Sequence, residues 1–566
     1  MYKPAPPRPK KTNIVRSRTG CQNCRERRTK CDEQKPVCGT CARLGKICQS
    51  TQPNFKFRSM NKPLTTPEMS QECMPSRQRL EREQSLKQSH CNVLSVGSMD
   101  LIKSLQHSER DIFYSTIWED YCLPAMHPMF QVLSGHVNDH PILRDATLAL
   151  SSCNFSRLHP EKKDSAASHM GFFSPNLVHQ TRSQLYYSSA IRRFTALSEA
   201  DCRANTTVVL TVLTVFAYIE SSMGNFRGFY CHDQGMSSLL LSLNTSSKDQ
   251  TLKGLLEAWI QIRIVIWWAR AHFCSLEVQQ HLPSVLLPGV FEEGLISLPG
   301  RRANVLSIMC ESHRLNFRAL MGFWYYQQNE HLWEEGEEFQ TTSLLLAGQA
   351  ERLDRWLAQL HPSDLPIEDE ALQDIYKTDL WRAPIYFQSH EAALNFAYYV
   401  VGRIMQCTGL LEGLRTRDPS YVAQACHKQE KWAWLLLRIV KGANMQSSLM
   451  MNNYTIGFSG LLLTALLRCQ SQSLGIEIQG WLQSLVDMKP TEEGAFPLYQ
   501  TLGVVKAINR QKMMHRDVFG VTLPVDDEGG TPKFTAYNSQ PISTLLLHGM
   551  CRTSGDLFTE CVLADI

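Results

Sequence analysis

Apolar residues recur at helical spacing through most of the chain after residue 100, and few segments alternate as a half-buried strand would. Gly-Asn, Pro-Gly and Asp-Pro steps separate these helical segments. The clearest of them cover residues 185–197, 208–220, 254–273, 392–407 and 460–469. We therefore expect a large all-α domain over residues 101–566, long enough to divide into two lobes near residue 300 or 370.

Residues 51–100 lack this periodicity. They are polar and interrupted by prolines, and we interpret them as a flexible linker. A short helix around residues 78–88 carries only Leu80 and Leu86, which do not sustain the three or four heptads of a coiled coil. A zipper dimer is therefore not predicted, whereas a monomer and a homodimer formed by the large domain both stay open.

The sequence predicts no membrane-spanning helix. The uninterrupted apolar run at residues 208–219 is shorter than the roughly 20 residues that a membrane helix needs, so we expect no membrane span.

The last segment of the large domain, residues 555–566, mixes acidic with bulky apolar residues. We interpret it as a terminal helix packed on the domain, with the recruitment of coactivators as the alternative.

The first 50 residues contain a repeated cysteine pattern. Two Cys-x2-Cys-x6-Cys triplets are displaced by 17 positions, and no histidine accompanies them. The six cysteines are Cys21, Cys24, Cys31, Cys38, Cys41 and Cys48. Any metal held here is therefore held by thiolates alone.

Ligand counting predicts two zinc ions. Each tetrahedral Zn²⁺ takes four ligands, so six thiolates suffice for two ions if two of them bridge both. Pseudo-symmetry nominates Cys21 and Cys38 as the bridges. A disulfide framework is the alternative, but residues 1–11 hold no apolar stretch for a secretory signal, and we expect a reducing compartment.

Charge points to a nucleic-acid partner. Residues 1–50 carry 13 Lys or Arg against three acids, a formal +10, whereas the rest of the chain is at −6. Between Cys24 and Cys31 lie four cations, and the matching segment between Cys41 and Cys48 has two. We expect the first segment to face the DNA, where arginines read guanine in the major groove and lysines grip phosphates.

Residues 19–48, with this spacing, resemble the fungal zinc binuclear cluster DNA-binding domain. The resemblance implies two structural zincs, bridging by Cys21 and Cys38, and a helix over a CGG-type half-site. It places the principal base-reading side chain at Arg28, where many relatives carry lysine, and a turn-forming proline at Pro36. The further candidates for DNA contact are Arg18, Arg25, Arg27, Lys30 and Arg43.

Residues 140–159, 185–191 and 220–235 resemble the fungal-specific transcription factor domain that accompanies such clusters. Together the two resemblances imply a mostly α protein with a disordered basic tail (1–15), a zinc-stabilised cluster module (16–50), a flexible linker (51–100) and a helical regulatory domain (101–566). They imply a nuclear, sequence-specific transcription factor, more often an activator, that binds promoter DNA and the transcription machinery. Many relatives control metabolic or secondary-metabolite gene clusters.

Motifs of catalysis are missing from the sequence. It contains no Gly-x-Ser-x-Gly elbow, phosphate-binding loop or dinucleotide fingerprint, and His390-Glu391 lacks the second histidine of a zinc protease. His136 and His140 are interpreted as part of a solvated turn. We therefore do not expect an enzyme. A protein-binding or metal-sensing cluster that does not act through DNA is the main rival, and a helical enzyme with a DNA tether is the other.

Overall fold

The structure is a computed structural model in which the chain forms two compact units, Met1–Asn92 and Val93–Ile566. Of the first unit it describes residues 21, 23–24, 29, 31–32, 34, 37–46 and 48. Of the second it describes residues 107–163, 172–242, 250–272, 276, 279, 301–328, 337–367, 383–407, 419–488, 492–494, 496–524 and 544–563. The expected tail and linker lie outside the described residues, so their boundaries stay predictions.

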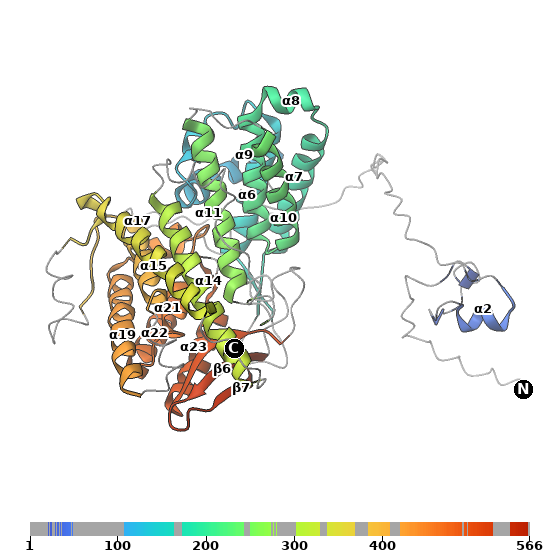
Figure 1. Ribbon diagram of the computed structural model, residues 1–566. Coiled ribbons are helices and arrows are strands. Elements are labelled where there is room, and N and C mark those ends of the chain that lie inside the picture. The colour runs from blue at the N-terminus through green and yellow to red at the C-terminus, as the bar shows by residue number, and fades with distance from the viewer. Residues whose placement is uncertain are drawn as a thin grey trace, which may run out of the picture. The chain divides into compact units, whose positions relative to one another are not determined.

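The second unit begins with a helical bundle over residues 107–272, here called the N-terminal bundle (Figure 1). Its α-helices are α4 (His107–Ile117), α5 (Met129–Ser134), α6 (Pro141–Leu158), α7 (Leu177–Thr195), α8 (Glu199–Ala204), α9 (Thr206–Ser222), α10 (Phe226–Ser242) and α11 (Gln250–His272). Short elements accompany them: η1 (Trp118–Cys122), η2 (Leu123–Ala125) and the paired strands β1 (Glu161–Lys163) and β2 (Phe172–Ser174).

A second bundle over residues 301–513, the C-terminal bundle, follows it. Its helices are α14 (Arg301–Gln328), α15 (Glu337–Ala358), η3 (Pro362–Asp364), α17 (His390–Met405), α19 (Pro419–Gly442), α20 (Met445–Met451), α21 (Phe458–Leu466), α22 (Gln472–Asp487) and α23 (Leu498–Met513). Serine and asparagine side chains begin several helices, as Ser389 does for α17 by accepting the Ala392 N–H at 3.1 Å. The five apolar segments singled out in the sequence coincide with α7, α9, α11, α17 and α21, which confirms the predominantly helical prediction.

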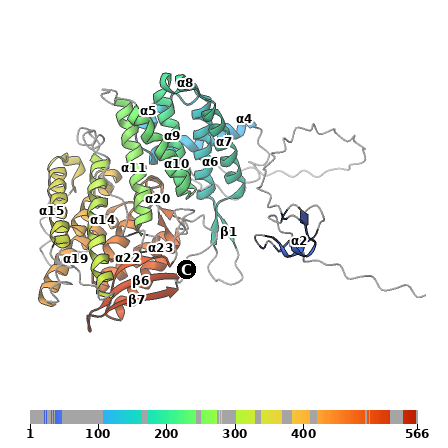
Figure 2. The same cartoon turned by 45° about the vertical axis from the view of Figure 1, so that its right-hand side comes forward.

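The C-terminal end of the chain adds a three-stranded antiparallel sheet in the order β5-β6-β7 (Figure 2). The strands are β5 (Arg516–Thr522), β6 (Thr544–Cys551) and β7 (Leu557–Leu563). The predicted terminal helix over residues 555–566 is therefore wrong, because β7 pairs along its length with the apolar strand β6. Pairing with a preformed apolar neighbour outweighs the weak local preference of this segment. The large unit is thus mostly, and not entirely, helical.

One apolar core runs through the second unit, from Trp118 in the N-terminal bundle to Leu547 in the sheet. Helix α21 lies inside it, and all nine of its residues are buried. The side chains of Tyr398 and Trp268 are fully buried in this core. Among the described helices, none combines the length and apolar character that crossing a membrane requires.

The buried start of α21 depends on one carboxylate. The first N–H groups of a helix need acceptors, and here water cannot supply them. Glu493, in the short strand β3 (Glu492–Glu493), accepts hydrogen bonds from the backbone N–H of Phe458 at 2.9 Å and of Ser459 at 2.8 Å. It also accepts from the Ser459 hydroxyl and from Asn452, both at 2.6 Å. The negative charge at a helix N-terminus adds to this stabilisation.

Replacing this carboxylate should destabilise the second unit. Glu493→Gln keeps the shape but turns one acceptor oxygen into a donor that faces other donors. We expect a loss of about 3 kcal/mol in the free energy of unfolding, measured by urea denaturation. The control is Glu199→Gln in an exposed ion pair with Arg203, with an expected change within about 0.5 kcal/mol. Equal effects of the two variants would contradict this assignment.

Candidate metal centre

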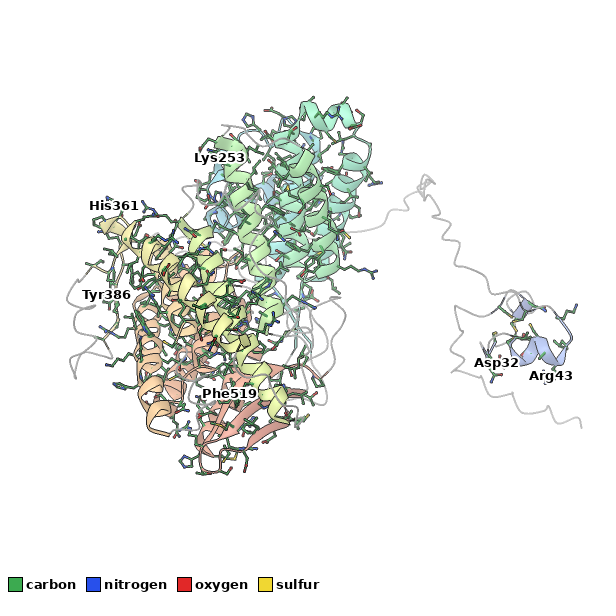
Figure 3. All side chains as sticks on the ribbon, in the orientation of Figure 1. Asp32, Arg43, Lys253, His361, Tyr386 and Phe519 are labelled. Atoms are coloured by element: carbon green, nitrogen blue, oxygen red, sulfur yellow. The ribbon has the colours of Figure 1, made fainter. Side chains whose placement is uncertain are left out.

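The six N-terminal cysteines lie together at the centre of the first unit. Five of them are buried and Cys48 is partly exposed, and they form the apolar core of this unit among the residues described. All six are free thiols, which excludes the disulfide framework in this structure. Figure 3 shows the module as a small body of its own, with Asp32 and Arg43 labelled on it.

The sulfurs form two groups of four that share two members. Within each group all sulfur atoms lie within 4.8 Å of one another. The first group is Cys21, Cys24, Cys31 and Cys38, and the second is Cys21, Cys38, Cys41 and Cys48. Cys21 and Cys38 are therefore common to both, which is the arrangement that two tetrahedral ions with six ligands require.

The sulfur–sulfur distances fit zinc. The Cys21 sulfur lies 3.7 Å from that of Cys38 and 3.6 Å from that of Cys41, and the sulfurs of Cys24 and Cys38 are 3.7 Å apart. Four thiolates at about 2.3 Å from a tetrahedral Zn²⁺ are separated by about 3.8 Å. The donor set contains thiols only, which suits zinc and not the hard cations that take oxygen ligands.

The local backbone favours thiolates at the two shared positions. A hydrogen bond from the Cys24 backbone N–H lowers the pKa of Cys21, and one from the Cys41 N–H lowers the pKa of Cys38. Burial instead raises the pKa of Cys24 to about 12, and it also raises the pKa of Cys41. The chain thus directs backbone dipoles at the sulfurs that would carry two metal bonds each.

The second half of the repeat is built around the short helix α2 (Gly39–Arg43). Its N-cap is Cys38, whose sulfur accepts the Cys41 N–H at 3.4 Å, so the ligand itself begins the helix. The helix ends at Leu44, and Gly45 follows with φ of +57°, a conformation that glycine adopts without strain. The Cys38 N–H in turn donates a hydrogen bond to the Cys48 sulfur at 3.4 Å.

Asp32 connects the two halves of the cysteine repeat, and no motif in the sequence indicates this role. Both of its carboxylate oxygens accept the Gly39 N–H, at 2.9 and 3.1 Å. A side chain at position 39 would displace this carboxylate, because a Cβ there would lie 2.6 Å from an Asp32 oxygen. Asp32 follows one ligand of the first group and Gly39 follows a shared ligand, so this contact sets the distance between the halves.

Of the predicted DNA contacts, the structure describes one. Arg43 is exposed in the last turn of α2. The remaining candidates, Arg18, Arg25, Arg27, Arg28 and Lys30, lie outside the described residues, and so does Pro36. Their roles stay predictions.

The histidines considered in the sequence do not form a second metal site among the described residues. His136 and Asp139 are both about two-thirds exposed, with 3.7 Å between the imidazole and the carboxylate. His390 is instead half-buried at the start of α17 and forms a 2.9 Å hydrogen bond with Asn452. In the described part of the chain, the two cysteine groups alone have a metal-binding arrangement.

Comparison with known proteins matches this module to an established family. Residues 19–56 match the fungal Zn(2)-Cys(6) binuclear cluster domain. Three similar proteins are the transcription activator AMTR1 of Alternaria alternata, the Zn(2)-C6 fungal-type transcription factor afumD of Aspergillus fumigatus and the transcriptional regulatory protein pro1 of Neurospora crassa.

Each of these similarities covers a short stretch of the chain. The identities are 48% over 61 residues, 58% over 38 and 49% over 49, which is 10%, 7% and 9% of this chain. The matches span 8%, 10% and 7% of the lengths of those relatives. No solved structure matches the chain. The comparison therefore supports the zinc cluster.

The Asp32 contact should affect metal affinity. Asp32→Ala removes both acceptors of the Gly39 N–H and loosens the two halves, so we expect zinc affinity to fall about tenfold. Asp32→Asn keeps one acceptor oxygen and should remain within about threefold of the parent protein. Competition with a chromophoric chelator under reducing conditions measures both values. An alanine variant that binds zinc as tightly as the asparagine variant would contradict the proposed coupling.

Proposed function

Because residues 19–56 belong to the fungal Zn(2)-Cys(6) binuclear cluster family, we propose that this protein is a sequence-specific DNA-binding transcriptional regulator whose DNA-reading module is held by two zinc ions. The observation that carries the proposal is the pair of four-sulfur groups that share Cys21 and Cys38. In this assignment Cys21 and Cys38 bridge both ions, and the other four cysteines each bind one.

The zinc ions have a structural role in this proposal. Every coordination position is filled by a thiolate, so no position is open for a reactive water or a substrate. The module has no apolar core apart from its cysteines among the residues described, and metal binding therefore provides the free energy that folds it. This assignment fits a regulator rather than an enzyme.

The charge of the module fits a DNA ligand. Six thiolates and two Zn²⁺ reduce the formal +10 of residues 1–50 to about +8, on a module too small to bury that charge. We assign base reading to Arg28, with Arg27 as a second candidate, over a CGG-like half-site. Phosphate contacts are assigned to Arg18, Arg25, Lys30 and Arg43, of which Arg43 is exposed on α2.

The helical unit would supply regulation. Its residues show no catalytic motif, and one relative of the cluster module is named a transcription activator. We propose that it controls RNA polymerase II genes from the nucleus, as an activator that contacts coactivators. Control of a metabolic or secondary-metabolite gene cluster and a homodimer formed by this unit belong to the same proposal.

The bridging assignment can be tested by metal counting. Cys38→Ser removes a ligand from both groups, so we expect it to lose both zinc ions and the fold of residues 19–48. Cys48→Ser removes a ligand from the second group only, and it should keep the first ion more tightly than Cys38→Ser does. Native mass spectrometry counts the ions directly. A Cys38→Ser protein that retains two zinc ions would exclude bridging by that sulfur.

The DNA assignment can be tested on a sequence selected from randomised duplexes. Arg28→Ala should cost about 1–3 kcal/mol on the selected site and relax discrimination at one base pair. Arg43→Ala is the matched control and should weaken binding to all sequences alike, with a salt dependence reduced by about one unit of log–log slope. Filter binding at several salt concentrations measures both. A zinc-loaded protein without sequence preference would instead favour a protein-interaction or sensor role.

A further inference from the structure

A cleft of about 370 Å³ lies between the two helical bundles. One wall comes from the N-terminal bundle, before α5 and along α11, and the other from the starts of α14 and α17 and the end of α15. Its volume falls in the range of about 300–1,000 Å³ that is usual for small-molecule sites. The residues that line it are His127, Pro128, Glu257, Gln261, Arg301, Arg302, Trp356, Leu360, Asp364, Ser389, Glu391, Ala392 and Asn395.

A smaller hollow of about 190 Å³ shares one wall with this cleft. His127, Pro128 and Glu257 line both of them, and Lys253, labelled in Figure 3, also lines the smaller one. The larger cleft by itself has room for a polar molecule larger than a single ion.

The wall of the cleft that belongs to the C-terminal bundle includes a guanidinium group whose N–H donors are only partly used by other residues. The Arg302 side chain is only 20% exposed. Among the described residues its Nε donates to Asn395 at 2.9 Å, and one terminal nitrogen lies 3.5 Å from the Glu391 carboxylate. Glu391 is 60% exposed, so that contact contributes little. Arginine has five N–H donors, and most of those on Arg302 are left for a ligand.

Neighbouring groups reinforce the positive character of this wall. The cleft is lined by the first residues of both α14 and α17, whose N-terminal ends carry partial positive charge. Arg301 is paired with Asp364, and Trp356 donates to the Arg301 carbonyl oxygen at 2.8 Å, so α14 begins in a fixed position. Arg302 is therefore the cation at this end that remains available for an anionic group.

The opposite wall offers a carboxylate with weak partners. The Glu257 side chain is 12% exposed, and Gln261 donates to it at the long distance of 3.3 Å. The Nε2 atom of His127 lies 3.6 Å from the other oxygen. The Nδ1 atom of His127 accepts the Met129 N–H at 3.2 Å, so Nε2 is the ring nitrogen that faces Glu257. Glu257 is thus a largely buried carboxylate whose contacts with Gln261 and His127 are both long.

We propose that this cleft binds a small zwitterion of the amino-acid class, with its carboxylate on Arg302 and its ammonium group on Glu257. An under-coordinated buried charge is costly, and here two of opposite sign line one cavity. A single molecule that carries both complementary charges satisfies both walls, whereas a simple anion or cation satisfies one. The zwitterion bridges two bundles that are distant in sequence, and it therefore stabilises their contact.

Binding is tested on the full-length, zinc-loaded protein, independently of DNA. Each of the twenty common amino acids is added at millimolar concentration, and thermal unfolding and titration calorimetry report binding. We expect at least one to raise the unfolding temperature. Its N-acetyl and amide derivatives, which lack one charge each, should bind at least about tenfold more weakly. Failure of every amino acid to bind overturns the proposal.

Two variants assign the charges to the walls. In Glu257→Gln, the amino acid should no longer bind more tightly than its N-acetyl derivative. In Arg302→Gln, the amino acid should no longer bind more tightly than its amide. Glu351→Gln and Arg355→Gln, at exposed positions of α15 outside the cleft, should leave affinity unchanged. Affinity that is equal in all four variants overturns the site. An N-acetyl form that binds as well as the amino acid overturns the zwitterion and indicates a plain anion site. DNA binding is measured separately, so loss of either proposal leaves the other standing.

Discussion

The sharing of two sulfurs between two four-sulfur groups is the constraint on which the N-terminal unit depends. Among the described residues of this unit the six packed thiols are themselves the apolar core, and as neutral groups they gain little from that proximity. Two divalent cations convert the same packing into eight metal–sulfur bonds if Cys21 and Cys38 each contribute two. The backbone prepares for this by lowering the pKa of these two thiols with N–H donors from Cys24 and Cys41. Folding and metal binding are then a single equilibrium.

The helical unit depends on a different constraint, because the ends of some of its helices lie in an apolar core, where water cannot pair with their backbone groups. Glu493 satisfies the start of α21 from a strand more than 30 residues away. Arg157 at the end of α6 pairs with the neighbouring Glu492, so one short strand receives contacts from both bundles. Buried charges of this kind require complete sets of partners. They fix the relative position of the helices more narrowly than apolar packing alone does.

The sequence was sufficient to predict those parts of the structure that local residue spacing determines. The cysteine spacing predicted a zinc cluster before any geometry was known, and helical periodicity located α9 and α11 to within a few residues. It was insufficient where distant segments meet. Strands β5 and β6 are short apolar runs that could equally be parts of buried helices, and only their pairing across residues 523–543 distinguishes them. Asp32 and Glu493 belong to no sequence motif, because the N–H groups from which they accept hydrogen bonds lie elsewhere in the chain.

The same reasoning explains why a ligand site can remain hidden in the helical unit. Arg302 and Glu257 belong to different helices, and neither stands in a motif, so only the folded structure shows that they line one cleft. In the proposed assignment the N-terminal unit is stabilised by metal–thiolate bonds and the helical unit by its apolar core. A molecule that bridges the two bundles would then stabilise the helical unit without altering the affinity of the cysteine cluster for metal. Under this proposal, separate sources of stability permit separate control of DNA binding and of the response to a ligand.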